Sequence, residues 1–140
     1  MSDARLSAEQ IQATFDASPF LGFLRLRVVA LDHDAGTLTV IMPMRPELER
    51  RLGTGQFHGG PIAAFIDTVG DYAIGMALGG GVPTINLRID YLRPAVGGSL
   101  TATARIRRAG RTVALVDVDV YDEQQALVAV GRGTYSGQRG

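Results

Sequence analysis

The sequence predicts an α+β domain in which a curved antiparallel sheet wraps around one long helix. Apolar residues recur at intervals of three and four along residues 61–78, as expected for a helix that packs on a core. Shorter segments on both sides alternate apolar and polar residues, which is typical of strands with one buried face. The order is helix, two strands, long helix and four strands, and the short turns between the last four favour antiparallel pairing.

The composition restricts the classes of function. All 140 residues fit one domain, large enough for a hydrophobic core. The 14 basic residues balance the 14 acidic ones, so no net charge directs the chain to nucleic acid or to an anionic membrane. The absence of cysteine excludes disulfides and a cysteine nucleophile, and two histidines are too few for a histidine-rich metal site. Neither a signal-peptide pattern nor a run of about 18 apolar residues occurs, so we expect a cytoplasmic protein without a membrane span.

The N-terminal part predicts a short helix and a hairpin. Ser7 and Gln10 have the spacing of a capping box, and an amphipathic pattern over residues 7–16 follows. Ser18-Pro19 is expected to end this helix. Two alternating segments around a turn then predict the hairpin, at residues 23–31 and 37–42.

The part after the long helix predicts four strands. Gly79-Gly80-Gly81 stops the helix. The alternating segments that follow are residues 84–93, 100–107, 112–121 and 126–135. Residues 137–140 are expected to be frayed.

The long helix carries two unusual acids. Small or apolar residues fill the side opposite its core face, so we expect it to be enclosed nearly all round. Asp67 and Asp71 are its only charged residues and lie four apart on one flank. A carboxylate in such surroundings needs partners or a proton, so both are candidates for chemistry. Either acid has an alternative role at a domain or subunit seam, paired with an arginine, although a role in chemistry is favoured for Asp67.

The start of this helix, His58-Gly59-Gly60-Pro61, leaves backbone N–H groups free. Their partial positive charge suits a carbonyl oxygen that becomes negative during a reaction, so the sequence predicts an oxyanion site with Asp67 as the base. Gly59 and Asp67 are eight residues apart, about 12 Å along a helix, and cannot easily reach one carbonyl within a chain. We therefore expect a dimer in which Gly59 of one subunit faces Asp67 of the other.

These residues resemble the hotdog fold, and within it the thioesterases of the phenylacetate-degradation type. The resemblance covers residues 20–136. It rests on His58-Gly59-Gly60, on Asp67 nine residues after the histidine, and on the strand end Tyr91-Leu92-Arg93-Pro94-Ala95. It implies hydrolysis of an acyl-CoA thioester, with coenzyme A as part of the substrate and no separate cofactor. It also implies assembly across a homodimer interface, commonly into a homotetramer.

The resemblance implies roles for particular residues. A carboxylate at Asp67 acts as nucleophile or as general base on water, the amide at Gly59 holds the carbonyl oxygen, and His58 supports the loop and the pocket. Relatives often have an asparagine about six residues before the histidine, and here only Gln56 or Arg51 is available as a substitute. Arginines are candidates for the coenzyme A phosphates, although they are equally ordinary solvated side chains. The residues expected to contact substrate are Gly60, Gln56, Asp71, Asn86, Arg88, Arg107, Arg108 and Arg111.

Two other functions remain open. The missing asparagine favours a non-catalytic hotdog domain that binds or senses acyl-CoA, although no DNA-binding segment accompanies it. A hotdog hydratase or dehydratase would use an aspartate and a histidine together. Here the one histidine outside a turn, His58, precedes the acid at a helix entry, so this function ranks last.

Overall fold

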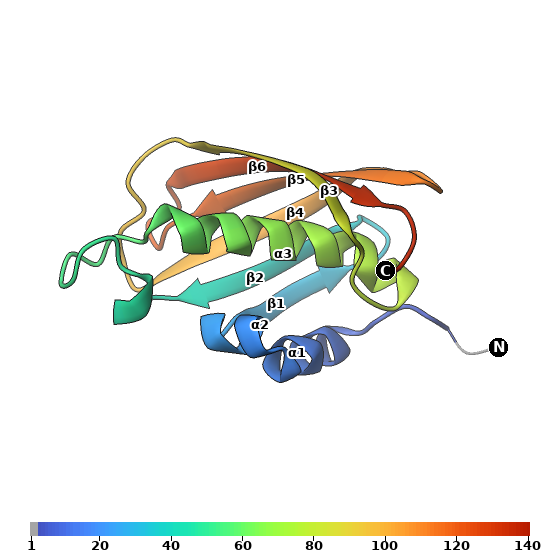
Figure 1. Ribbon diagram of the computed structural model, residues 1–140, viewed down its shortest axis with the longest axis horizontal. Helices are drawn as coiled ribbons and strands as arrows, with labels where there is room; N and C mark the ends of the chain where they lie inside the picture. The colour runs from blue at the N-terminus through green and yellow to red at the C-terminus, as the bar shows by residue number, and fades with distance from the viewer. Residues whose placement is uncertain (1–2) are drawn as a thin grey trace.

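A six-stranded antiparallel sheet curves around one long helix, α3 (Gly59–Leu78), and confirms the predicted hotdog fold (Figure 1). This computed structural model describes residues 3–140. The strand order is β1-β2-β4-β5-β6-β3, so the connection from β2 to β3, which contains α3, crosses the sheet to its far edge. The strands are β1 (Arg27–Asp32), β2 (Thr37–Pro43), β3 (Thr84–Tyr91), β4 (Ser99–Ala109), β5 (Val113–Tyr121) and β6 (Leu127–Ser136).

The N-terminal elements differ from the prediction in one place. Helix α1 (Ala8–Ala17) begins at the expected capping box. Helix α2 (Pro19–Leu24) then occupies the start of the segment predicted as a strand over residues 23–31, so that prediction is wrong before Arg27. The reason is local, because the Ser18 hydroxyl caps α2 and Pro19 fills its first turn.

The start of the tail and the connection before α3 both have defined local structure. The Gly137 N–H donates to the Thr112 carbonyl at 2.8 Å, so the tail expected to fray is anchored at its first residue. The polar connection contains one 3₁₀ turn, η1 (Pro46–Leu48).

One face of α3 packs on the inner face of the sheet, against β2, β4, β5 and β6. Within one chain the helix is not enclosed all round as expected, since Ala77 is exposed and Thr68 is half-buried. By length and apolar composition alone, α3 is able to cross a membrane. However, 50% of an 18-residue stretch of this helix is buried in the fold, as in the core helix of a folded domain. Its buried residues are Ile62, Phe65, Ile66, Val69, Gly70, Ala73, Ile74, Gly75 and Met76.

The two edges of the sheet differ in how far their backbone groups are covered. The Gln12 side chain of α1 covers the β1 edge, donating to the Leu26 carbonyl at 2.9 Å and accepting from the Val28 N–H at 2.7 Å. Within residues 3–140, strand β3 pairs only with β6, so its other edge is free in that part of the chain. Ile85 and Tyr91 on β3 are 59% and 52% exposed. An edge with open backbone groups and exposed apolar side chains can accept another strand.

Candidate active site

Both ends of β3 hold the central helix through a side-chain hydroxyl. At the C-terminal end of the strand, the Tyr91 hydroxyl donates to the Gly59 carbonyl at 2.8 Å. At the N-terminal end, the Thr84 hydroxyl donates to Oδ1 of Asp67 at 2.8 Å. The two residues that the sequence marks for chemistry are therefore anchored to opposite ends of the same strand.

The loop before α3 keeps one backbone donor free. The His58 ring caps the helix, because its Nδ1 accepts from the Gly60 N–H at 3.0 Å, which places the ring proton on Nε2. The His58 N–H donates to the Leu48 carbonyl at 2.8 Å. Across residues 3–140, the Gly59 N–H has no hydrogen-bond acceptor. The Gly60 amide is thus used by the fold, whereas the Gly59 amide is available.

A hollow of about 340 Å³ lies beside Gly59. Gln56 contributes to it, so the structure brings together Gln56 and Gly59, two of the expected site residues. Asp67 does not line this hollow, so the donor and the carboxylate do not meet within one chain. The lining residues are Arg50, Gln56, Phe57, Gly59, Ile62, Tyr91, Leu92, Arg93, Pro94 and Ala95.

Asp67 is half-buried and is held at its side chain and at its backbone. The Thr84 hydroxyl donates to Oδ1 of Asp67, and the Tyr135 hydroxyl donates to the Asp67 backbone carbonyl at 3.1 Å. Burial, followed by the charges of Asp67 and Asp71, raises the pKa of Tyr135 above its ordinary value, so the phenol stays a donor. Oδ2 of Asp67 accepts no hydrogen bond from residues 3–140 and is free to act on a water molecule.

Asp71 has a structural contact. Its Oδ1 accepts from the Val82 N–H at 2.9 Å and ties α3 to the loop that follows it. Burial raises the pKa of Asp71 to about 6, the charge of Asp67 adds to the shift, and the Val82 N–H opposes it. No arginine within residues 3–140 pairs with Asp71. The same range holds no group of three or more His, Asp or Glu side chains that could bind a metal ion.

The polar residues expected around coenzyme A do not gather near Gly59 in one chain. Arg88 and Arg107 form ion pairs with neighbouring acids, at 3.5 and 3.6 Å. The β4–β5 hairpin lies at the C-terminal end of α3, where Arg111 and Leu78 line the same hollow. Gly59 lies at the opposite, N-terminal end of this helix. The residues that lie on β3 or around this hairpin are Asn86, Arg88, Arg107, Arg108 and Arg111.

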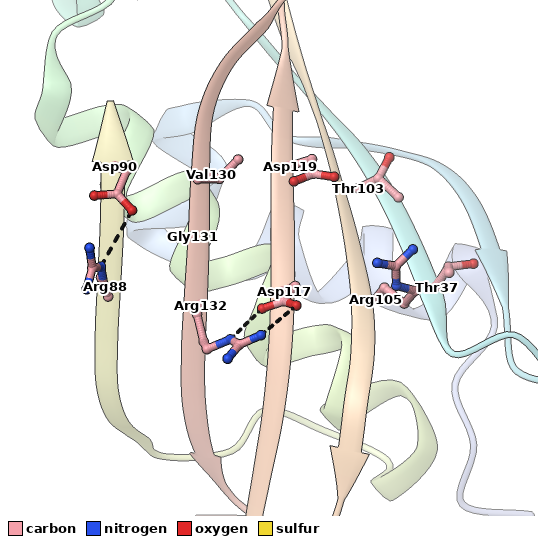
Figure 2. Close-up of a pocket in the computed structure, with 10 residues that line it drawn as sticks. All are labelled: Thr37, Arg88, Asp90, Thr103, Arg105, Asp117, Asp119, Val130, Gly131 and Arg132. Carbon is pink, nitrogen blue, oxygen red and sulfur yellow. Dashed lines mark hydrogen bonds and ion pairs between the residues drawn. The ribbon is translucent and has the colours of Figure 1, made fainter. Parts of the chain in front are cut away.

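The outer face of the sheet carries a larger hollow, of about 550 Å³ (Figure 2). Strand register aligns its side chains in two rows, one with a surplus of arginine and one with a surplus of aspartate. Arg132 binds Asp117 through two hydrogen bonds, of 2.7 and 3.0 Å, which lower the pKa of Asp117. The arginine row is Arg88, Arg132, Asp117, Arg105 and Thr37, and the aspartate row is Asp90, Val130, Asp119 and Thr103.

The sequence does not predict three residues of the site: Thr84, Tyr91 as a helix anchor, and Tyr135. Their contacts with α3 join positions 17, 32 and 68 residues apart, so no local pattern indicates them. Only Tyr91 belongs to a motif that the sequence shows.

Comparisons with known proteins identify the family. The sequence model of the thioesterase superfamily matches residues 54–129. A Halobacterium salinarum protein named as an esterase is 36% identical over 144 residues, covering 95% of this chain and 93% of that protein. The acyl-coenzyme A thioesterase PaaI of Escherichia coli is 32% identical over 112 residues, covering 77% of this chain and 76% of that protein.

Solved structures agree with this assignment. The structure of E. coli PaaI has a TM-score of 0.76 at 27% identity, covering 91% of this chain and 90% of that chain. The X-ray structure of a protein from the thioesterase superfamily has a TM-score of 0.85 at 30% identity, covering 96% of this chain and 98% of that chain. This chain therefore belongs to the thioesterase superfamily.

Proposed function

We propose that this protein hydrolyses an acyl-CoA thioester to a carboxylic acid and free coenzyme A, in active sites shared between two subunits. The observation that carries the proposal is the arrangement of β3, which holds Asp67 at one end and Gly59 at the other. PaaI, a relative of this chain, is named an acyl-CoA thioesterase. Coenzyme A enters as part of the substrate, and the reaction uses no further cofactor. A cytoplasmic location stays a prediction.

The free edge of β3 is the proposed dimer interface. If two copies of β3 pair antiparallel around a two-fold axis at the strand midpoint, Thr84 of one subunit lies opposite Tyr91 of the partner subunit. The pairing covers the exposed Ile85 and satisfies the open backbone groups. It also carries Asp67 toward the partner's Gly59, because each residue is tied to the adjacent strand end. The dimer then has two complete sites.

In such a site the two groups have complementary roles. The thioester carbonyl oxygen accepts from the free Gly59 N–H, at the positive end of α3. Oδ2 of Asp67 takes a proton from water as the water oxygen attacks the carbonyl carbon. The C–S bond then breaks, and the leaving thiolate takes up that proton. Attack by Asp67 itself, followed by hydrolysis of the anhydride, gives the same products and is the alternative role of this carboxylate.

The outer face of the sheet is the proposed contact between two dimers. A two-fold axis that runs between its rows places the arginine row of one copy against the aspartate row of the other. This contact would give the homotetramer. Salt screens such charge pairs, so light scattering should show the assembly shifting toward dimers as ionic strength rises. A tetramer insensitive to salt would exclude this face as the contact.

Thiol release from a panel of acyl-CoAs tests the activity. Asp67→Asn should lose about a hundredfold or more in rate while still binding substrate. Gly59→Pro should lose about two to three orders of magnitude, because it removes the amide donor. The fold accommodates this proline, since Gly59 is the first helical residue and His58 is already extended, with ψ of 151°. Gly59→Ala keeps the N–H and is the matched control. Equal hydrolysis by Asp67→Asn and wild type would exclude the assignment.

The same experiment decides the second function. The absence of asparagine in residues 50–57 favours a protein that binds acyl-CoA without hydrolysing it. Tight binding without thiol release from any member of the panel would support that function and exclude hydrolysis.

A further inference from the structure

One tyrosine of β6, Tyr135, binds the middle of α3 through a hydrogen bond. Tyr135 is fully buried, and its hydroxyl donates to the Asp67 carbonyl at 3.1 Å. A helical carbonyl also accepts from the N–H four residues later, here that of Asp71. The tyrosine therefore adds a second hydrogen bond to the turn of α3 that carries both acids.

Two glycines make room for this contact. A Cβ on Gly70 of α3 or on Gly133 of β6 would overlap the Tyr135 hydroxyl. Their missing side chains let the helix and the strand approach closely at this one turn. A phenylalanine ring would fill the same space, so packing alone does not require the hydroxyl.

We propose that Tyr135 is a positioning residue for the reaction, whose hydroxyl fixes this turn of α3 and thereby aims the Asp67 carboxylate at the substrate. The inference rests on the proposed function, because Asp67 needs a fixed direction only if it acts on a substrate. Thr84 holds the carboxylate itself, and Tyr135 holds the backbone behind it. A carboxylate fixed at both points is preorganised for one direction of attack.

The variant Tyr135→Phe removes the hydroxyl and keeps the ring. We expect kcat to fall about five- to tenfold, while KM for acyl-CoA and Kd for a non-hydrolysable thioether analogue change less than about twofold. Tyr121→Phe is the matched control, because Tyr121 is half-buried at the end of β5 and its hydroxyl makes no hydrogen bond within residues 3–140. Thermal unfolding of both variants measures the folded fraction at the assay temperature.

Two outcomes overturn the inference. One is a kcat for Tyr135→Phe equal to that for Tyr121→Phe. The other is a loss of kcat accounted for entirely by a smaller folded fraction. Asp67→Asn, measured alongside, separates the two proposals. If Asp67→Asn loses hydrolysis and Tyr135→Phe does not, only the role of Tyr135 fails. If Asp67→Asn retains the full rate, the proposed function loses its base and the role of Tyr135 falls with it.

Discussion

The Asp71 carboxyl should make the protein less stable as the pH rises from about 4 to about 6. Burial, with the Asp67 charge adding, raises the pKa of Asp71 from its ordinary value of 3.8 to about 6. The folded protein therefore keeps this proton to a higher pH than the unfolded chain does. The resulting contribution to stability is fully present below about pH 4 and is lost as the pH rises through about 6.

The size of this effect follows from the shift. About two pKa units correspond to about 3 kcal/mol, and solvent screening of the partly buried Asp71 reduces this to about 1–2 kcal/mol. Asp71→Asn keeps an oxygen for the Val82 N–H and removes the ionisation. The free energy of unfolding of the variant, minus that of wild type, should thus increase by about 1–2 kcal/mol between about pH 4 and pH 7.

Urea unfolding followed by circular dichroism, at a fixed protein concentration and stepped pH, measures this difference. Subtracting the free energy of unfolding of wild type at each pH removes the effect of other acids. One of these is Asp117, whose pKa is lowered and whose contribution to stability therefore changes with pH in the opposite direction. A difference that stays constant across this pH range would refute the reasoning.

Three further predictions concern the contacts around the site. Thr84→Val should lower kcat about tenfold with little change in KM, whereas Thr84→Ser, which keeps the hydroxyl that binds Asp67, should retain the rate; equal rates in steady-state assays would contradict this role. Gly70→Ala should lower Tm by about 3–6 °C in wild type and by less in Tyr135→Phe, because the hydroxyl oxygen that overlaps the new methyl group is absent from that variant. An identical loss of Tm in both backgrounds would argue against the close contact between the Tyr135 hydroxyl and α3. Ile85→Asp, on the free edge of β3, should yield folded monomers without hydrolysis; a monomer seen by light scattering that is still active would exclude shared sites.

The architecture could be predicted from the sequence because its signals are local. The three-four spacing along α3 and the alternation in the strands are visible within short windows. The strand prediction is wrong at residues 23–26 because Ser18-Pro19, which ends α1, also caps and starts α2. The order β1-β2-β4-β5-β6-β3 depends on pairing between distant segments, which no short window specifies.

The candidate site could be predicted only in part, for a similar reason. The sequence itself indicates Gly59 and Asp67, because a glycine-rich helix start and an acid on an apolar helix are unusual. The partners that fix them, Thr84, Tyr91 and Tyr135, approach from other strands. Sequence spacing could show that Gly59 and Asp67 lie too far apart along the helix, but not that β3 holds one at each end.

The central proposal is that each active site uses Asp67 of one subunit and Gly59 of the other. Equal amounts of Asp67→Asn and Gly59→Pro protein, each inactive alone, can be unfolded together and refolded. About half of the dimers should then be mixed, and each mixed dimer has one intact site, so the predicted rate is about one quarter of that of wild type. A mixture that remains as inactive as its components would contradict the shared site and place both groups in one chain.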